Sequence, residues 1–140
     1  MSATPEIPWE RLFEAALGAR ANAYAPYSHF RVGAAAMLED GRIVSGCNVE
    51  NASYGLTVCA ERNAVAAAVA LGKTRLRALA LVSSAMDAVM PCGACRQVLS
   101  EFAPVSLAIR TRGGSGAERV TTLGALLPDA FGRAALPASR

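Results

Sequence analysis

Three cysteines stand at the predicted starts of two helices, and they constrain the fold more than any other feature of this sequence. Cys59 precedes an alanine-rich helical segment, and Cys92 and Cys95 lie in a Pro-Cys-Gly-Ala-Cys segment that opens another helix. Two cysteines three residues apart in a first helical turn share a face, so their sulfurs can hold one metal ion. Helix N-termini favour the thiolate form that binds metal. Cys59 can supply a third sulfur with the same support, which indicates one site built from both helix starts.

Three sulfur ligands would leave the fourth position of a tetrahedral zinc site open to water, as in catalytic rather than structural zinc sites. Glu61 follows Cys59 by two residues, so its carboxylate can reach that water without being a ligand. A carboxylate placed there can take a proton from the water and deliver it to a substrate. Three thiolates overcompensate the charge of the ion, and we therefore expect Arg62 to hydrogen-bond a thiolate and withdraw charge from it.

Cys47, the fourth cysteine, leaves a second interpretation open. As a fourth sulfur ligand it would close the site and make the chain a structural zinc module with four cysteine ligands and no enzymatic activity. Side chains alternate along the predicted strand at residues 42–49, which puts Cys47 and Asn48 on opposite faces and favours Cys47 as a small buried residue. A redox-active Cys-x-x-Cys pair is a weaker alternative, because it accounts for neither Cys59 nor Glu61.

Hydrophobic periodicity predicts an α/β fold. The Asp-Gly pair at 40–41 indicates a hairpin, and the glycine-rich turn at 113–116 favours a second antiparallel pair, because a parallel return needs a longer crossover. Helices between the other strands imply crossovers that cover a sheet. We expect a three-layer α/β/α sandwich with a five-stranded mixed sheet. Its helices are expected at 8–20, 58–71 and 93–102, and its strands at 30–38, 42–49, 77–83, 105–111 and 118–122.

Composition favours a single domain over residues 1–140 and argues against several kinds of partner. The chain is 53% hydrophobic and 18% charged, which is apolar for a small monomer and is typical of surface buried between subunits. The net charge is +3 and the basic residues are dispersed, so we expect no nucleic-acid partner. No apolar run could span a membrane and no secretion signal is recognisable, so we expect a cytoplasmic protein with reduced cysteines.

The sequence resembles the short, homotetrameric cytidine deaminases whose zinc is held by three cysteines. Cys-x-Glu combined with Pro-Cys-x-x-Cys is a signature of zinc nucleobase deaminases. The resemblance weakens only after Gly132, where the family commonly continues with Pro and this chain continues with Arg133. It is carried by Tyr-Ala-Pro-Tyr-Ser at 24–28, Gly-Cys-Asn-Val-Glu-Asn-Ala-Ser-Tyr-Gly at 46–55, Cys-Ala-Glu-Arg-Asn-Ala at 59–64, Pro-Cys-Gly-Ala-Cys-Arg-Gln-Val-Leu at 91–99 and Leu-Pro-Asp-Ala-Phe-Gly at 127–132.

The resemblance implies a zinc-dependent enzyme of pyrimidine salvage. It would deaminate cytidine and 2′-deoxycytidine by hydrolysis, giving uridine or 2′-deoxyuridine and ammonia. One zinc ion per subunit would be held by Cys59, Cys92 and Cys95, and Glu61 would shuttle protons. A homotetramer with active sites shared between subunits is also implied. The implied substrate contacts are Asn48 and Glu50 on the ribose, Phe30 on the pyrimidine ring, and Ala52, Tyr54 and Phe131 completing pockets, partly across subunit boundaries.

A related aminopyrimidine nucleoside, such as blasticidin S, is an alternative substrate for the same zinc centre, because deaminases of that antibiotic share the Pro-Cys-Gly-x-Cys-Arg-Gln run. Asn48 and Glu50 favour a free nucleoside instead. The two residues are two apart on an extended segment, so both can face one pocket. An amide and a carboxylate together can donate to and accept from a sugar hydroxyl.

Overall fold

Strand β1 (Val32–Leu38) is buried along its whole length, which requires a covering layer on each face of the sheet that contains it. The computed structural model describes residues 6–137 and places five strands in the order β2-β1-β3-β4-β5. The β3 and β4 strands are parallel, and the other neighbours are antiparallel. The expected five-stranded mixed sheet is therefore confirmed. Its remaining strands are β2 (Ile43–Cys47), β3 (Leu76–Ser83), β4 (Ala108–Arg112) and β5 (Glu118–Thr122).

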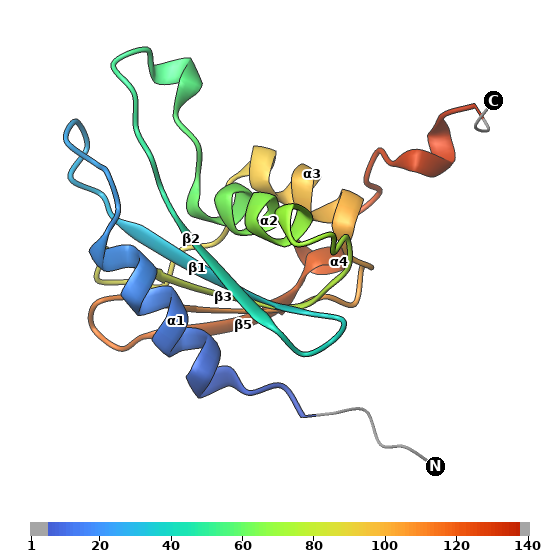
Figure 1. The fold of residues 1–140 in the computed structure, drawn as a ribbon, viewed down its shortest axis with the longest axis horizontal. Helices are drawn as coiled ribbons and strands as arrows, with labels where there is room; N and C mark the ends of the chain where they lie inside the picture. The colour runs from blue at the N-terminus through green and yellow to red at the C-terminus, as the bar shows by residue number, and fades with distance from the viewer. Residues whose placement is uncertain (1–5, 138–140) are drawn as a thin grey trace.

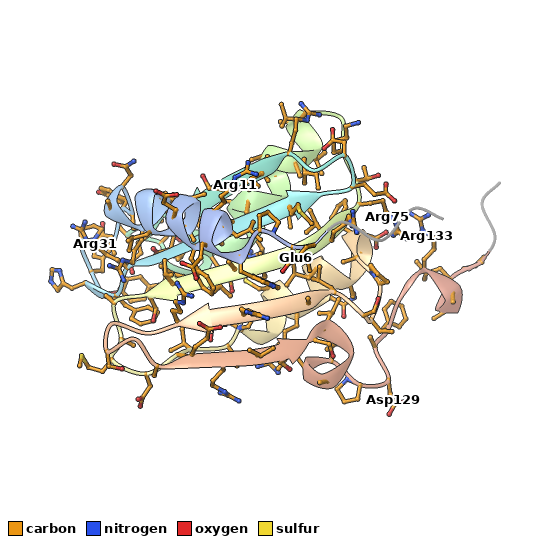
Figure 2. All side chains as sticks on the ribbon, turned by 90° about the horizontal axis from the view of Figure 1, so that it is seen from below. Glu6, Arg11, Arg31, Arg75, Asp129 and Arg133 are labelled. Carbon is orange, nitrogen blue, oxygen red and sulfur yellow. The ribbon has the colours of Figure 1, made fainter. Side chains whose placement is uncertain are left out.

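Helices form the two outer layers, as the sequence predicts (Figure 1). Helix α1 (Trp9–Ala21) packs on β1, β2 and β3 from one side, and β4 and β5 extend beyond it (Figure 2). Helices α2 (Ala60–Ala70) and α3 (Gly93–Phe102) cover the opposite face. In the part of the chain that the structure describes, no helix combines the length and the apolar character needed to cross a bilayer.

Some boundaries differ from the sequence prediction for local reasons. The sequence predicts Phe30 in a strand, but Phe30 lies in the loop before β1 and the residue is 38% exposed. The fourth strand begins at Ala108 rather than at 105, because a turn in which Leu107 N–H donates to the Pro104 carbonyl comes first. The sequence pattern does not predict the short helix α4 (Leu123–Leu126), which the Thr122 hydroxyl caps by accepting from Ala125 N–H.

The order of the strands brings the starts of α2 and α3 to one edge of the sheet. Strands β2 and β3 are both antiparallel to β1, so they run parallel to each other, and α2 connects them. Helix α3 likewise connects the parallel strands β3 and β4. Each of these helices therefore begins near the carboxyl ends of the strands, where α/β folds place their binding sites.

Helix α2 approaches the sheet very closely at Gly46 in β2. A Cβ atom at this position would lie 2.5 Å from the backbone nitrogen of Ala64 and 2.7 Å from the carbonyl oxygen of Ala60. Both atoms belong to the helix backbone and cannot turn aside as a flexible side chain would. The distance between α2 and β2 therefore depends on the absence of a side chain at Gly46.

We expect Gly46→Ala to lower the free energy of unfolding by about 1–3 kcal/mol, as overpacking in a close contact does. Thermal or urea unfolding measures the change. Gly18→Ala is the matched control: Gly18 lies in α1, and a methyl group added there would have no atom within 4 Å, so the replacement should stabilise the helix by up to about 1 kcal/mol. Unchanged stability of Gly46→Ala would contradict the close packing.

Candidate functional site

The sulfur atoms of the three cysteines meet where α2 and α3 begin. Cys59 is the N-cap of α2, Cys92 is the N-cap of α3, and Cys95 lies in the first turn of α3. The Sγ atoms of Cys59 and Cys92 are 3.8 Å apart, those of Cys92 and Cys95 are 3.5 Å apart, and all three lie within 4.8 Å of one another. Tetrahedral zinc with bonds of ~2.3 Å holds its sulfur ligands ~3.8 Å apart. The donor set and its spacing therefore fit zinc.

Cys47 lies on the other face of the sheet from this sulfur cluster. It pairs directly with Gly33 across the β1–β2 ladder, and directly paired residues share a face. A Cβ on Gly33 would meet the Ala16 carbonyl in α1, so both positions face α1. Within residues 6–137, the group of possible metal ligands contains Cys59, Cys92 and Cys95 without Cys47. The geometry therefore favours a site with three sulfur ligands.

Glu61 is buried in the first turn of α2, beside the sulfur cluster, with 5% of its surface exposed. Burial raises the pKa of its carboxyl group, and the nearby charge of Cys59 raises it further. A carboxyl group with a raised pKa is better matched to accepting and releasing a proton during a reaction. Its position and its pKa thus suit a proton carrier next to the sulfurs.

The thiols of the sulfur cluster differ in their affinity for protons. Hydrogen bonding from the Cys95 thiol, with further bonding from Arg62, lowers the pKa of Cys59 to about 5. The same bond to Cys59, together with burial, raises the pKa of Cys95. The Arg62 guanidinium lies with Nη2 3.7 Å from the Cys59 sulfur and 3.3 Å from the Thr57 carbonyl oxygen. A fixed positive charge therefore faces the Cys59 thiol, whose pKa is lowered.

A cavity of about 260 Å³ opens beside the sulfur cluster and Glu61. Its mainly apolar wall has a few polar groups, as small-molecule sites do. Three of the predicted substrate contacts, Phe30, Asn48 and Glu50, line this cavity together with residues of the metal-binding edge, where α2 and α3 begin. The complete lining is Phe30, Val32, Asn48, Glu50, Thr57, Cys59, Ala60, Glu61, Leu81, Val89, Met90 and Cys92.

Asn48 and Glu50 hold the loop that carries Phe30. The buried Asn48 side chain accepts from Val32 N–H at 2.9 Å and donates to the Phe30 carbonyl at 2.7 Å. The Glu50 carboxylate accepts from the N–H groups of Tyr27 and Ser28 and from the Ser28 hydroxyl. Bonding from Ser28 lowers the pKa of Glu50, so its carboxylate is ionised and acts as an acceptor.

Ala52, Tyr54 and Phe131 do not line this cavity within the single chain. Tyr54 is 76% exposed and Phe131 is 62% exposed. Figure 2 shows Asp129 and Arg133, which lie two residues before and after Phe131 in the sequence, at one end of the molecule. Arg31, which follows Phe30 in the sequence, lies at the other end. The exposed positions are compatible with a role across a subunit boundary, and that role stays a prediction.

Sequence reasoning missed Val89 and Met90, and it did not foresee the hydrogen bonds of Arg96. Val89 and Met90 line the cavity just ahead of the Pro-Cys motif, and their place beside that motif was the only signal for them. Arg96 fixes the same segment, because its guanidinium donates to the carbonyls of Pro91 at 2.7 Å and Leu126 at 2.9 Å. No local pattern reveals such bonds, since Leu126 is 30 residues away along the chain.

Comparisons with known proteins agree with this geometry. A family model described as "Cytidine and deoxycytidylate deaminase zinc-binding region" matches residues 8–111. Among curated proteins, the chain is 51% identical to cytidine deaminase from Mycobacterium tuberculosis over 136 residues, which is 97% of this chain and 98% of the relative. It is 44% identical to cytidine deaminase from Halalkalibacterium halodurans over 122 residues, covering 87% of this chain and 92% of the relative.

Solved structures give the same result. The crystal structure of cytidine deaminase from Burkholderia pseudomallei matches with a TM-score of 0.85 and 49% identity, covering 89% of this chain and all of that one. The crystal structure of cytidine deaminase from Mycobacterium tuberculosis matches with a TM-score of 0.78 and 49% identity, covering 91% of this chain and 99% of that one. The predicted α/β fold is thus confirmed by comparison as well as by topology.

We expect Cys92→Ala to lose most of its zinc during purification, because it removes one of three sulfur ligands. Elemental analysis of the purified protein measures the zinc content per chain. Cys47→Ala is the matched control and should retain the wild-type content, since Cys47 faces α1. Equal loss of zinc from both variants would instead support the structural site with four sulfur ligands.

Proposed function

The chain belongs to the cytidine deaminase family, and from this premise we propose that it hydrolyses cytidine and 2′-deoxycytidine to uridine and 2′-deoxyuridine with release of ammonia. The observation that carries this proposal is the buried Glu61 carboxyl group next to three converging sulfurs, in a cavity that also presents Phe30 and Glu50. That arrangement places a proton carrier, a metal site and groups suited to a nucleoside around one volume.

Zinc held by Cys59, Cys92 and Cys95, one ion per chain, would supply the Lewis acidity that makes a water molecule more acidic. The protein supports the sulfurs in two ways. The N-termini of α2 and α3 direct their positive dipole ends toward Cys59 and Cys92. Arg62 donates toward the Cys59 sulfur and offsets part of the negative charge of three thiolates.

Glu61 carries the protons of the reaction. Its carboxylate takes a proton from the attacking water and delivers it to ring N3, while the water oxygen forms a bond to C4. Glu61 then accepts the second proton of that oxygen and passes it to the exocyclic amine. The C4–N bond breaks, ammonia leaves and the carbonyl of uridine forms. The burial of Glu61 keeps bulk water from competing for these protons.

The substrate is held by residues from two segments that meet at the cavity. The Phe30 ring packs on the pyrimidine, and the ionised Glu50 accepts a hydrogen bond from a ribose hydroxyl. Asn48 lies beside Glu50, and its amide has one N–H left after its bond to the Phe30 carbonyl. These contacts select a nucleoside by its ring face and by its sugar.

The proposal extends to assembly and location. A single domain over residues 1–140 would assemble as a homotetramer, in which Ala52, Tyr54 and Phe131 complete the pockets of neighbouring subunits. The exposure of Tyr54 and Phe131 supports this arrangement, because large apolar side chains at the surface favour burial between chains. A cytoplasmic enzyme of pyrimidine salvage fits four cysteines that are all free.

We expect Glu61→Gln to lower kcat on cytidine by about 10²- to 10⁴-fold, because it removes the proton carrier while keeping its shape. The fall in ultraviolet absorbance as cytidine becomes uridine measures the rate. Zinc content and circular dichroism should match the wild type and so exclude loss of metal or fold. Near-wild-type turnover would exclude the proposed role of Glu61.

Arg62→Gln should lower kcat while zinc content stays at the wild-type level, because the uncharged amide no longer withdraws charge from Cys59. Steady-state kinetics and elemental analysis measure the two quantities on one preparation. Arg11→Gln, an exposed change on α1 in the opposite layer, should leave both unchanged. Unaltered turnover of Arg62→Gln would refute the charge-withdrawing role.

A further inference from the structure

The loop before β1 meets the segment after β2 through one serine that bonds to two proposed substrate contacts. The hydroxyl of Ser28 donates to Oε2 of Glu50, and Ser28 Oγ also accepts from Phe30 N–H at 3.0 Å. Ser28 N–H and Tyr27 N–H both donate to Oε1 of Glu50, at 3.1 and 3.0 Å. One side chain thus touches the sugar-binding carboxylate and the backbone of the residue that packs on the ring.

We propose that Ser28 is a positioning residue that sets the orientation of the Glu50 carboxylate and the place of Phe30 relative to each other. The inference rests on the proposed function, because it takes Glu50 as the acceptor for a ribose hydroxyl and Phe30 as the ring contact. Ser28 itself does not line the cavity beside the sulfur cluster. It acts through the two residues that do.

The hydrogen-bond capacity of Glu50 explains why one serine matters. A carboxylate offers about four acceptor positions, and the loop occupies three of them. The three bonds restrict the rotation of the carboxylate plane, and one acceptor position remains for a substrate hydroxyl in the cavity that Glu50 lines. Without the Ser28 hydroxyl, only the two hydrogen bonds to Oε1 would remain, and the carboxylate could rotate about that oxygen.

The backbone between Ser28 and Phe30 needs this support. His29 adopts a φ of 58°, in the left-handed region that costs a non-glycine residue free energy. This turn is held on one side by His29 N–H, which donates to the Ala25 carbonyl at 3.0 Å, and on the other by the Ser28 hydroxyl. Loss of the hydroxyl leaves Phe30 N–H without this acceptor, so the Phe30 backbone and its ring are held less firmly.

The acidity of Glu50 gives a readout that a purely structural role would not change. Bonding from the Ser28 hydroxyl is the main cause of its lowered pKa, and the charge of His29 makes a smaller contribution. The other titratable groups around Glu50 are Tyr27 on the facing loop, Tyr54 on its own loop, and Cys59 and Glu61 across the cavity. Ser28→Ala should therefore raise the pKa of Glu50 toward its ordinary value.

We expect Ser28→Ala to raise KM for cytidine by about 10- to 100-fold, with a smaller change in kcat. This factor corresponds to the free energy of one hydrogen bond to a charged group. Ser28→Thr keeps the hydroxyl and should restore most of the affinity.

The acid limb of the pH profile of kcat/KM should move to higher pH in Ser28→Ala, because protonated Glu50 no longer accepts from the sugar. With 2′,3′-dideoxycytidine, the loss caused by Ser28→Ala should shrink.

A ¹³C NMR titration of the Glu50 carboxyl carbon tests the coupling without any turnover. It should show a higher pKa in Ser28→Ala than in the wild type. Two variants serve as controls. Ser45→Ala removes an exposed serine hydroxyl on β2, away from Glu50. His29→Asn removes the nearby charge, and asparagine tolerates the left-handed φ at this position. An unchanged Glu50 pKa overturns the inference and leaves the proposed function standing, whereas wild-type protein that fails to release ammonia from cytidine overturns the proposed function and, with it, the role of Ser28 in substrate binding.

Discussion

The meeting of two helix N-termini at one edge of the sheet is the constraint on which the rest of the site depends. Cys59 and Cys92 are N-caps, so their sulfurs converge only if α2 and α3 begin side by side. The parallel relation of β2, β3 and β4 provides this, and the missing side chain at Gly46 lets α2 lie against β2. A shift of either helix would separate the sulfurs, because each is attached directly to a helix end.

Electrostatics then decides what the converging groups can do. Three sulfurs and Glu61 concentrate negative charge in a small buried volume. The helix dipoles and Arg62 offset part of it and favour the Cys59 thiolate, whereas burial and the charge of Cys59 keep the pKa of Glu61 raised. The same elements thus stabilise bound metal and leave the carboxyl group able to exchange protons. A structural metal site would not need the buried acid.

The half of the cavity proposed to hold the substrate is built differently, from loops rather than helix ends. Asn48 and Glu50 use side-chain hydrogen bonds to hold the backbone around Phe30, where no regular strand pairing does so. These bonds fix the position of the loop, whereas the packing of α2 and α3 fixes the position of the metal-binding residues. The position of this loop therefore depends on single polar side chains.

The sequence by itself determined the sulfur cluster, Glu61, the α/β class and most elements, because helix starts, motif spacing and hydrophobic periodicity are local properties. The helix at Gly93–Phe102 and the strand at Glu118–Thr122 have the bounds that the sequence predicts. Only the tertiary structure placed Phe30 outside the strand, Val89 and Met90 on the cavity wall, and Ser28 against Glu50. These facts come from contacts between segments far apart in the chain, and packing decides such contacts where no local pattern records them.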